Sequence, residues 1–322
     1  MSGSVMTPPS AFPRKRSRVE RPIVRPVEGG PSTSHRAARH VVLLGAFLAW
    51  TSETPPATAV PASPKTSSAS RESAVIAALT LDPTVRLSAA TEPLLGARYV
   101  LSPLGEGEGI DPDPRFRLDA FDCTTFVETA LALASSSSLD TARARLDQIR
   151  YADGEALFEK RRHLVTSQWV PGIVKLGLLE DVTTTVAKER TEKIALVLTP
   201  KRWKKRWVAR TLALDERSLT FGEFEIPILP LEAARDVTIE ARIPTGTVVN
   251  VVRAPYGSAP DFVTHQGIVL VDPKNASRRI VRHASPVRGR VVDEPFEKLV
   301  RRYARPRKWA VVGLQFLEVK LR

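Results

Sequence analysis

The change of hydrophobic period near the middle of the chain constrains the fold more than any other feature of this sequence. Before Asp181, apolar residues recur at helical spacing, for example from Cys123 to Ser135. Beyond Asp181, short apolar or alternating runs are separated by Pro, Gly and Asp, which is typical of strands. Helices first and strands later indicate an α+β fold, in which N-terminal helices pack on a mostly antiparallel sheet.

These patterns predict individual elements. The predicted helices are Ser73 to Leu81, Cys123 to Ser135, a helix with Asp140 as its N-cap, and Glu155 to Val165. The predicted strands are Ile194 to Leu198, Trp207 to Leu212, Val237 to Ile243, Thr247 to Val252, Gly267 to Val271 and Val311 to Val319. Residues 186–243 carry few candidate functional groups, so we interpret them as an insertion within one domain that spans 73–322.

The N-terminal part of the chain has a different character. Residues 1–40 are rich in Pro, Arg, Ser and Gly and lack an apolar period, which predicts a disordered basic extension. Residues 41–59 come after positively charged residues and consist of an apolar run and then a small-residue stretch that ends at Ala59. This order is typical of a secretory signal. The run is too short for a stable transmembrane span, which needs about 20 residues. We therefore expect export to the periplasm or cell envelope, with residues 60–72 as a linker.

The charge of the chain does not select a partner. Its net charge is +13, but the first 70 residues hold 9 Lys and Arg against 3 Asp and Glu, so the remainder is only mildly basic. Mild basicity suits nucleic acid and anionic wall polymers alike. A composition of 43% hydrophobic and 26% charged residues excludes a wholly disordered or collagen-like chain.

The chain has one cysteine, Cys123, which excludes an internal disulfide and a site with several Cys ligands. Asp122 is a good N-cap, so Cys123 is predicted in the first turn of a helix. Unpaired N–H groups and the positive end of the helix dipole favour a thiolate there. This segment alone leaves two interpretations open, a nucleophile or a small residue at a helix start.

A nucleophilic thiol needs a base, and three histidines lie outside the N-terminal segments: His163, His265 and His283. His265 stands at the start of a strand in the segment Asp261 to Leu270, and His283 stands at the end of the next strand candidate, in Arg279 to Pro286. A turn at Asp272 to Ser277 would place both imidazoles at one edge of the sheet. One would act as the base and the other would orient it. Gly267, two residues after His265, is expected to leave room for a substrate.

The segment from Phe121 to Glu128 resembles the Asp-Cys helix start of the NlpC-type papain-like cell-wall hydrolases. It is most similar to the branch described as N-acetylmuramoyl-L-alanine amidase-like. Further matches follow in the family's order: Ile149 to Tyr151, Gly154, Arg161 to His163, Trp169, Gly177, Asp181 to Thr183, His265 to Gly267, His283 to Ser285, and Gly313. Two features depart from the pattern, namely the basic stretch Lys201 to Trp207 and Leu164, where the family has an aromatic residue.

The resemblance implies a papain-like fold and a cysteine hydrolase that uses no cofactor and no metal. Cys123 would be the nucleophile, His265 the base and His283 the third polar member. The substrate would be peptidoglycan or a muropeptide, and the favoured prediction for the bond that is cut is the amide between N-acetylmuramic acid and L-alanine. Four residues are expected at the substrate: Asp122, Arg161, His163 and Trp169. We expect a monomer without a nucleic-acid partner.

Other functions stay open at this point. A γ-D-glutamyl-diamino acid endopeptidase would use the same catalytic residues on the stem peptide. A metal site built from Cys123, His265 and His283 is a second alternative, although these residues lack a short paired ligand spacing. Cations and aromatics alternate in Lys201 to Trp207, so a non-catalytic polyanion or cell-wall binder is a third, although charge protecting a strand edge is the simpler interpretation.

Overall fold

The computed structural model describes residues 68–204, 219–306 except 256 and 258, and 308–321, all within a unit that spans Val60–Arg322. The basic extension 1–40, the signal-like segment 41–59 and the predicted strand Trp207 to Leu212 lie outside the described residues. Helix α1 begins at Ser68, inside the stretch predicted as a linker. Among the described residues, no helix combines the length and apolarity needed to cross a bilayer.

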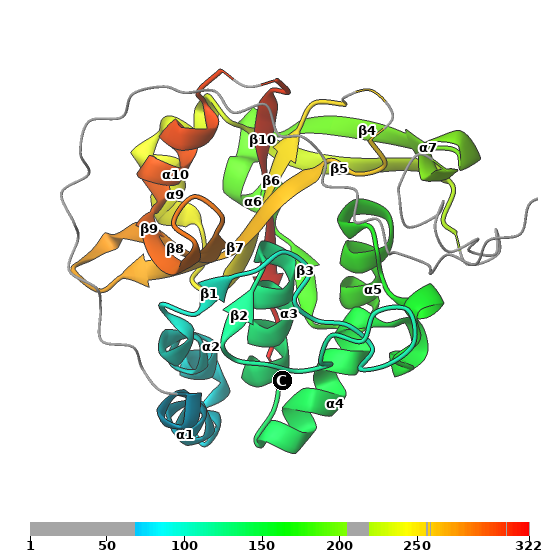
Figure 1. The fold of residues 1–322 in the computed structure, drawn as a ribbon. Helices are drawn as coiled ribbons and strands as arrows, with labels where there is room; N and C mark the ends of the chain where they lie inside the picture. The colour runs from blue at the N-terminus through cyan, green and yellow to red at the C-terminus, as the bar shows by residue number, and fades with distance from the viewer. Residues whose placement is uncertain (1–67, 205–218, 256, 258, 307, 322) are drawn as a thin grey trace, which may run out of the picture. The chain divides into compact units, whose positions relative to one another are not determined.

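A ten-stranded sheet occupies the centre of this unit (Figure 1). Its order is β2-β1-β9-β8-β7-β6-β10-β5-β4, and β3 pairs with β10. Only the short strands β1 and β2 pair in parallel; the other described pairs are antiparallel, which confirms the predicted mostly antiparallel sheet. The strands are β1 Arg98–Tyr99, β2 Ala120–Phe121, β3 Leu179–Asp181, β4 Glu192–Leu198, β5 Gly222–Pro230, β6 Thr247–Arg253, β7 Val263–Asp272, β8 Asn275–Ser285, β9 Arg290–Pro295 and β10 Val311–Val319.

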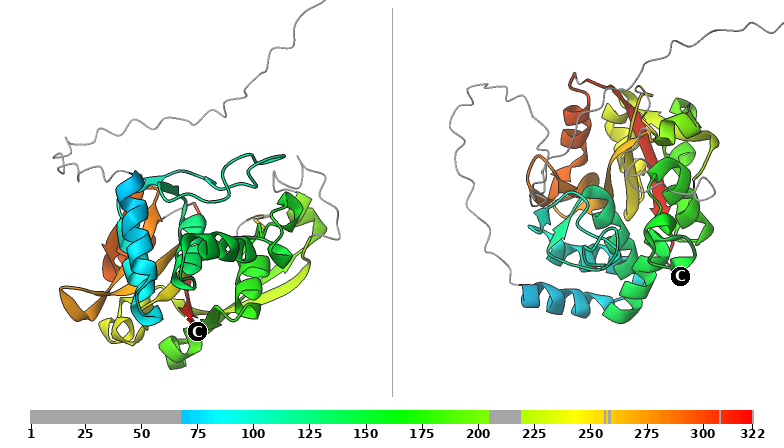
Figure 2. Two further views of the ribbon diagram at one scale, coloured as in Figure 1. Left: turned by 90° about the horizontal axis from the view of Figure 1, so that it is seen from below. Right: turned by 45° about the vertical axis from the view of Figure 1, so that its right-hand side comes forward.

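Helices cover both faces of the sheet, so its central strands are buried on both sides (Figures 1 and 2). Val248 and Ile268 pack with α1 to α5, whereas their neighbours Val249 and Val269 pack with α6, α9 and α10. The helices are α1 Ser68–Leu79, α2 Pro83–Thr91, α3 Cys123–Ala134, α4 Leu139–Arg150, α5 Val170–Lys175, α6 Thr183–Ala187, α7 Pro200–Lys204, α9 Val237–Arg242 and α10 Phe296–Tyr303. Short 3-10 turns lie at Glu92–Leu94, Ala152–Gly154, Phe158–Lys160, Lys188–Arg190 and Ala233–Arg235, and a π-turn at Val165–Trp169.

The predicted helix from Cys123 is confirmed as α3, whereas the N-cap predicted for α4 is wrong. The cap is Ser138, whose hydroxyl accepts a hydrogen bond from the backbone N–H of Thr141 at 3.2 Å. The Thr141 hydroxyl oxygen in turn accepts a hydrogen bond from the Ser138 N–H, which completes a capping box. Asp140 instead lies in the first turn, where its charge complements the helix dipole.

The helix predicted over Glu155 to Val165 does not form, apart from the 3-10 turn η3 at Phe158–Lys160. The chain reverses after α4 through Asp153 and Gly154, which have φ angles of 59° and 75°. Arg162 then donates to the carbonyls that end α4, those of Gln148, Ile149 and Tyr151. This segment therefore serves as the C-terminal cap of α4 rather than as a helix of its own.

The strand predicted over Val237 to Ile243 is also wrong, because the segment forms α9. Asp236 caps this helix by accepting from the Thr238 N–H at 2.9 Å. Ile239 and Ile243, four residues apart, are buried on one side, which satisfies the same apolar pattern in a helix. The strands predicted around Ile194 to Leu198, Thr247 to Val252, Gly267 to Val271 and Val311 to Val319 are confirmed as β4, β6, β7 and β10.

The stretch 186–243 joins the central sheet. It contributes β4 and β5, which form an antiparallel pair, and β5 in turn pairs with β10 through Leu229 and Leu314. Leu196 and Ile228 lie in a small apolar cluster with Val252 of β6. Its interpretation as an insertion stays a prediction.

Candidate active site

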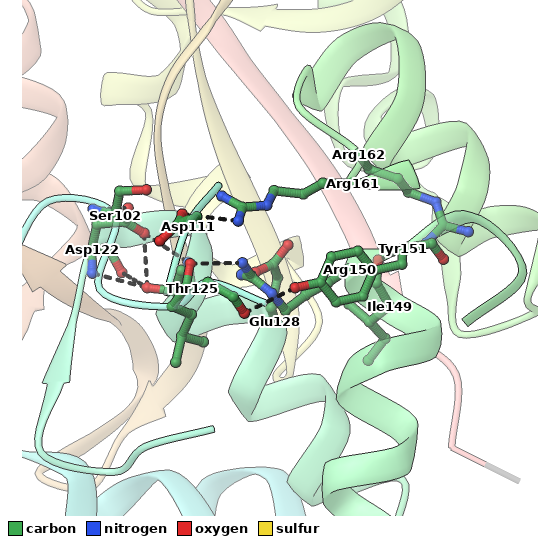
Figure 3. Close-up of polar contacts among 12 residues, drawn as sticks. Ser102, Asp111, Asp122, Thr125, Glu128, Ile149, Arg150, Tyr151, Arg161 and Arg162 are labelled. Atoms are coloured by element: carbon green, nitrogen blue, oxygen red, sulfur yellow. Dashed lines mark hydrogen bonds and ion pairs between the residues drawn. The ribbon is translucent and has the colours of Figure 1, made fainter. Parts of the chain in front are cut away.

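Cys123 is the first residue of α3, as the sequence predicts. Asp122 caps the helix: its Oδ1 accepts from the Thr125 N–H at 2.8 Å, and its own N–H donates to Thr125 Oγ1 at 2.9 Å. Its second oxygen accepts from the Ser102 N–H at 2.9 Å (Figure 3). Both oxygens of Asp122 thus bind protein backbone, which gives this residue a structural role at the helix start.

The environment of the Cys123 thiol keeps it protonated. The residue is half-buried, and α3 packs against β7 and β8. Burial raises the pKa of Cys123 to about 12, and the nearby Asp122 adds to this effect. Hydrogen bonds from the Gln266 backbone N–H and from Thr124 lower the pKa but do not offset burial. The thiolate expected from the helix dipole is therefore not the resting form, because desolvation outweighs the dipole.

His265 and His283 lie side by side, as the sequence predicts. His265 Nε2 is 2.7 Å from His283 Nδ1, and the ring planes are nearly perpendicular at 89°. Only 4% of His265 is exposed and none of His283. His265 is the neighbour of Gln266, whose N–H bonds the Cys123 sulfur, so β7 carries both His265 and the backbone contact of Cys123.

The pairing of β7 with β8 ends just beside the two histidines. The register runs from Asp272 back to Ile268, opposite Arg282. Gly267 follows, and a Cβ there would lie 2.6 Å from Val281 Cγ1 and 3.0 Å from His283 Cβ. Glycine at this position therefore makes room for His283 rather than for a substrate, which corrects the expectation from the sequence.

The imidazole of His265 is neutral at physiological pH. Burial lowers its pKa well below the ordinary value, and the charges of His283 and Arg302 lower it further, whereas Glu294 opposes them. Its ring also lies against that of Tyr303 in α10, with centroids 6.0 Å apart. Cys123 and His265 thus both rest in their uncharged forms.

The sequence analysis missed Glu294, which lies behind His283. Glu294 Oε2 is 3.3 Å from His283 Nε2 and accepts from Arg302 Nη2 at 2.7 Å. Burial would raise the pKa of Glu294, but bonds from His283 and Arg302 lower it to about 2, so the side chain is a carboxylate. An acidic residue on the strand that pairs with the His283 strand was the available signal. We call His265, His283, Glu294 and Arg302 the histidine chain.

A second group of buried charges lies beside α3. Glu128 of α3 pairs with Arg150 at 2.5 Å, and Arg150 also donates to the Leu104 carbonyl at 3.1 Å (Figure 3). Arg161 donates to Glu106 Oε1 at 2.5 and 2.8 Å and to Asp111 Oδ2 at 2.9 Å. Leu104, Glu106 and Asp111 belong to one segment between β1 and β2, which Arg150 of α4 holds through the Leu104 carbonyl and Arg161, after η3, holds through the two carboxylates. We call Glu106, Asp111, Glu128, Arg150 and Arg161 the loop clamp.

The other residues expected at the substrate occupy different environments. Trp169 is completely buried in the core with α5, so the expectation that it touches substrate is wrong. His163 Nε2 lies 2.9 Å from the Phe158 carbonyl oxygen, and its ring stacks at 4.7 Å from that of Phe158. Arg161 is paired with Glu106 and Asp111 of the loop clamp.

No three His, Cys, Asp or Glu side chains in the described part of the chain are arranged to hold a metal ion. The alternative of a metal site at Cys123, His265 and His283 therefore finds no support in the geometry.

Comparisons with known proteins identify a family and similar folds. The profile of a family described as AmiA-like, N-acetylmuramoyl-L-alanine amidase-like, matches residues 89–305. A Legionella pneumophila protein assigned to the DUF1460 family is similar in structure, with a TM-score of 0.68 and 23% identity over 78% of this chain and 94% of that one. An N-acetylmuramoyl-L-alanine amidase from Bacteroides uniformis gives a TM-score of 0.53 and 23% identity over 70% and 95%. No curated protein matches.

Proposed function

This chain belongs to the N-acetylmuramoyl-L-alanine amidase-like family, and on that premise we propose that it is a cysteine amidase. It hydrolyses the bond between N-acetylmuramic acid and L-alanine in peptidoglycan or its released fragments. The observation that carries the proposal is the 2.7 Å contact of His265 with His283, next to the residue whose N–H bonds the Cys123 sulfur. A cysteine at a helix start beside a histidine on an antiparallel sheet also supports a papain-like class.

The first half of the reaction begins from the neutral pair. His265 Nε2 is engaged by His283, so Nδ1 is the nitrogen that takes the thiol proton as sulfur attacks the amide carbonyl. The S–C bond forms and a tetrahedral oxyanion develops. His265 then gives this proton to the leaving nitrogen of L-alanine, the C–N bond breaks, and a muramoyl thioester of Cys123 remains.

The second half returns the enzyme to its starting state. Water loses a proton to His265 Nδ1 and attacks the thioester carbonyl. The S–C bond breaks, the proton on His265 returns to sulfur, and the lactyl carboxylic acid leaves and gives the remaining proton of the water to solvent. Because proton transfer accompanies each attack, neither half requires a thiolate in the resting enzyme.

The oxyanion would be stabilised at the start of α3. The backbone N–H of Cys123 is one of the unpaired donors in the first helical turn. Tyr99 would be a second donor, since it pairs with Phe121, two residues before Cys123, and burial, together with Cys123 and Asp122, raises the pKa of its phenol to about 12. Sequence reasoning did not single out Tyr99, because nothing local marks a residue of β1 as a neighbour of α3.

Digestion of purified muropeptides, followed by mass spectrometry of the products, tests the proposed bond. We expect free stem peptide beginning with L-alanine, and its absence with Cys123→Ala. Products cut between D-glutamate and the diamino acid would instead establish the endopeptidase that the same residues could serve. Activity that survives in Cys123→Ala would contradict a cysteine mechanism for either bond.

We also propose that the enzyme works outside the cytoplasm, where its substrate lies. The family is a cell-wall amidase-like one, and residues 41–59 have the order of a secretory signal. Removal of residues 1–59 should leave muropeptide hydrolysis in vitro unchanged and abolish export. A full-length protein with an intact N-terminus in the cytoplasm would contradict this.

A further inference from the structure

We propose that Glu294, held by Arg302, is a positioning residue that selects the tautomer of His265 through His283. The inference rests on the proposed function only in naming the reaction that the tautomer serves. The geometry itself concerns four side chains from four elements: His265 of β7, His283 of β8, Glu294 of β9 and Arg302 of α10.

The contacts of the two imidazoles define a chain of alternating donors and acceptors. Where two imidazole nitrogens share a hydrogen bond, one must carry a proton and the other must not. The first contact joins His265 Nε2 to His283 Nδ1 at 2.7 Å, and the second brings His283 Nε2 to 3.3 Å from Glu294 Oε2. His283 Nε2 is fully buried and makes no hydrogen bond among the described residues, so the Glu294 carboxylate acts on it as a charge at 3.3 Å.

The state of Glu294 fixes every proton along this chain. A carboxylate attracts an N–H and repels a lone pair, so an imidazole of His283 with a single proton carries that proton on Nε2. His283 Nδ1 is then an acceptor, and His265 must donate to it from Nε2. The remaining nitrogen of a neutral His265, Nδ1, therefore has a free lone pair and can act as the base toward the thiol.

Arg302 keeps Glu294 in this role. Its guanidinium donates to both carboxylate oxygens, Nη2 to Oε2 at 2.7 Å and Nε to Oε1 at 3.3 Å. These charge-assisted bonds hold the carboxylate ionised and oriented toward His283. If Glu294 were removed, the neighbouring charged group would be a guanidinium, which only donates and so favours an unprotonated His283 Nε2. The proton on each imidazole would then move to the other nitrogen, and His265 would present an N–H to the thiol.

The variant Glu294→Ala tests the inference, and Asp293→Ala is its matched control. Asp293 is the adjacent residue of β9 and accepts from Arg282 at 2.8 and 2.9 Å, but it contacts neither histidine in the described structure. Both variants remove a carboxylate from an arginine pair on the same strand. A purely structural role predicts similar losses of stability in both, with unchanged chemistry of the folded protein.

Three readouts separate the variants. In ¹⁵N NMR spectra, wild-type His265 should be protonated at Nε2 and bare at Nδ1, and Glu294→Ala should reverse this, whereas Asp293→Ala should not. Alkylation of Cys123 by iodoacetamide at pH 7 should slow at least about tenfold in Glu294→Ala alone, because the base no longer accepts the thiol proton. Its kcat on muropeptides should fall at least about 10²-fold, the usual size of lost acid–base catalysis.

Glu294→Asp keeps an acceptor and should retain the wild-type tautomers, with a smaller loss of kcat than Glu294→Ala. A wild-type His265 that is protonated at Nδ1 would overturn the inference, and this measurement needs no variant to fold. Equal alkylation rates in Glu294→Ala and Asp293→Ala would overturn it as well. The NMR and alkylation readouts do not use the amide substrate. If Glu294→Ala reverses the tautomers but the wild-type protein cleaves no muropeptide amide, the proposed function is wrong and this inference stands.

Discussion

The loop clamp and the histidine chain are both buried groups of charged and polar side chains, yet they handle charge differently. In the loop clamp, arginine and carboxylate touch directly, as in the 2.5 Å contact of Arg150 with Glu128. In the histidine chain, the ion pair of Arg302 with Glu294 lies at one end, and two imidazoles separate it from Cys123. Direct pairing holds a segment in place, whereas in the proposed mechanism an ion pair behind two imidazoles orients a base that can still exchange its proton.

The largest expected difference between activity and stability is that of Cys123→Ala. It should abolish hydrolysis and leave the free energy of unfolding nearly unchanged, because the thiol acts in the chemistry and holds nothing in place. Cys123→Ser should also lose most of its activity, since a hydroxyl is far less acidic than a thiol. Turnover on muropeptides and urea denaturation are the two measurements. If the Ala variant keeps more than a few per cent of wild-type turnover, the thiol is not the nucleophile.

The next largest effect should separate the two histidines. His265→Ala should lower kcat by about 10²–10⁴-fold, because the group that takes and returns the proton is gone. His283→Asn can still donate or accept one hydrogen bond to His265, so it should retain more activity than His265→Asn. The alkylation rate of Cys123 near neutral pH should fall in the same order. A larger loss on both measures for His283→Asn would mean that the roles are exchanged.

In the loop clamp, the removal of a polar side chain should lower stability rather than activity. Glu128→Ala leaves Arg150 buried without its carboxylate and should lower the free energy of unfolding by about 3–5 kcal/mol. Replacing the pair together, Glu128→Leu with Arg150→Met, should cost less, because no unpaired charge remains. Urea denaturation measures both, and kcat per folded molecule should change little. A specific loss of kcat in the folded Glu128→Ala protein would show that the clamp takes part in the chemistry.

The smallest expected effect is that of pH on kcat/KM in the neutral to alkaline range. His265 has a pKa lowered well below its ordinary value, so the neutral base is present as soon as the pH rises above that lowered pKa. Cys123 has a pKa raised to about 12, so the thiol does not lose its proton as the pH passes the ordinary cysteine range. The profile of kcat/KM for the free enzyme should therefore lack an alkaline limb between pH 7 and 9. A limb near pH 8.5 would indicate a thiol of ordinary pKa.

Local sequence determined the parts of this protein that depend on neighbours in the chain. Asp122 and Thr125 cap α3 through contacts three residues apart, so the position of Cys123 follows from the sequence alone. Two strands joined by a short turn bring His265 and His283 together for the same reason. The family motifs lie on these segments, which is why the sequence could connect them with an amidase site.

Only the tertiary structure decided the features that depend on burial and distant contacts. Val237 to Arg242 became a helix because Ile239 and Ile243 pack on one side, although their spacing suits a strand as well. Desolvation is likewise a property of the folded environment, so no local pattern could show that the Cys123 thiol stays protonated. Glu294 reaches the histidines through the pairing of β8 with β9 and is held there by Arg302 of α10. The sequence therefore pointed to the proposed nucleophile and its proposed base, whereas their protonation and the proposed positioning residue depend on the fold.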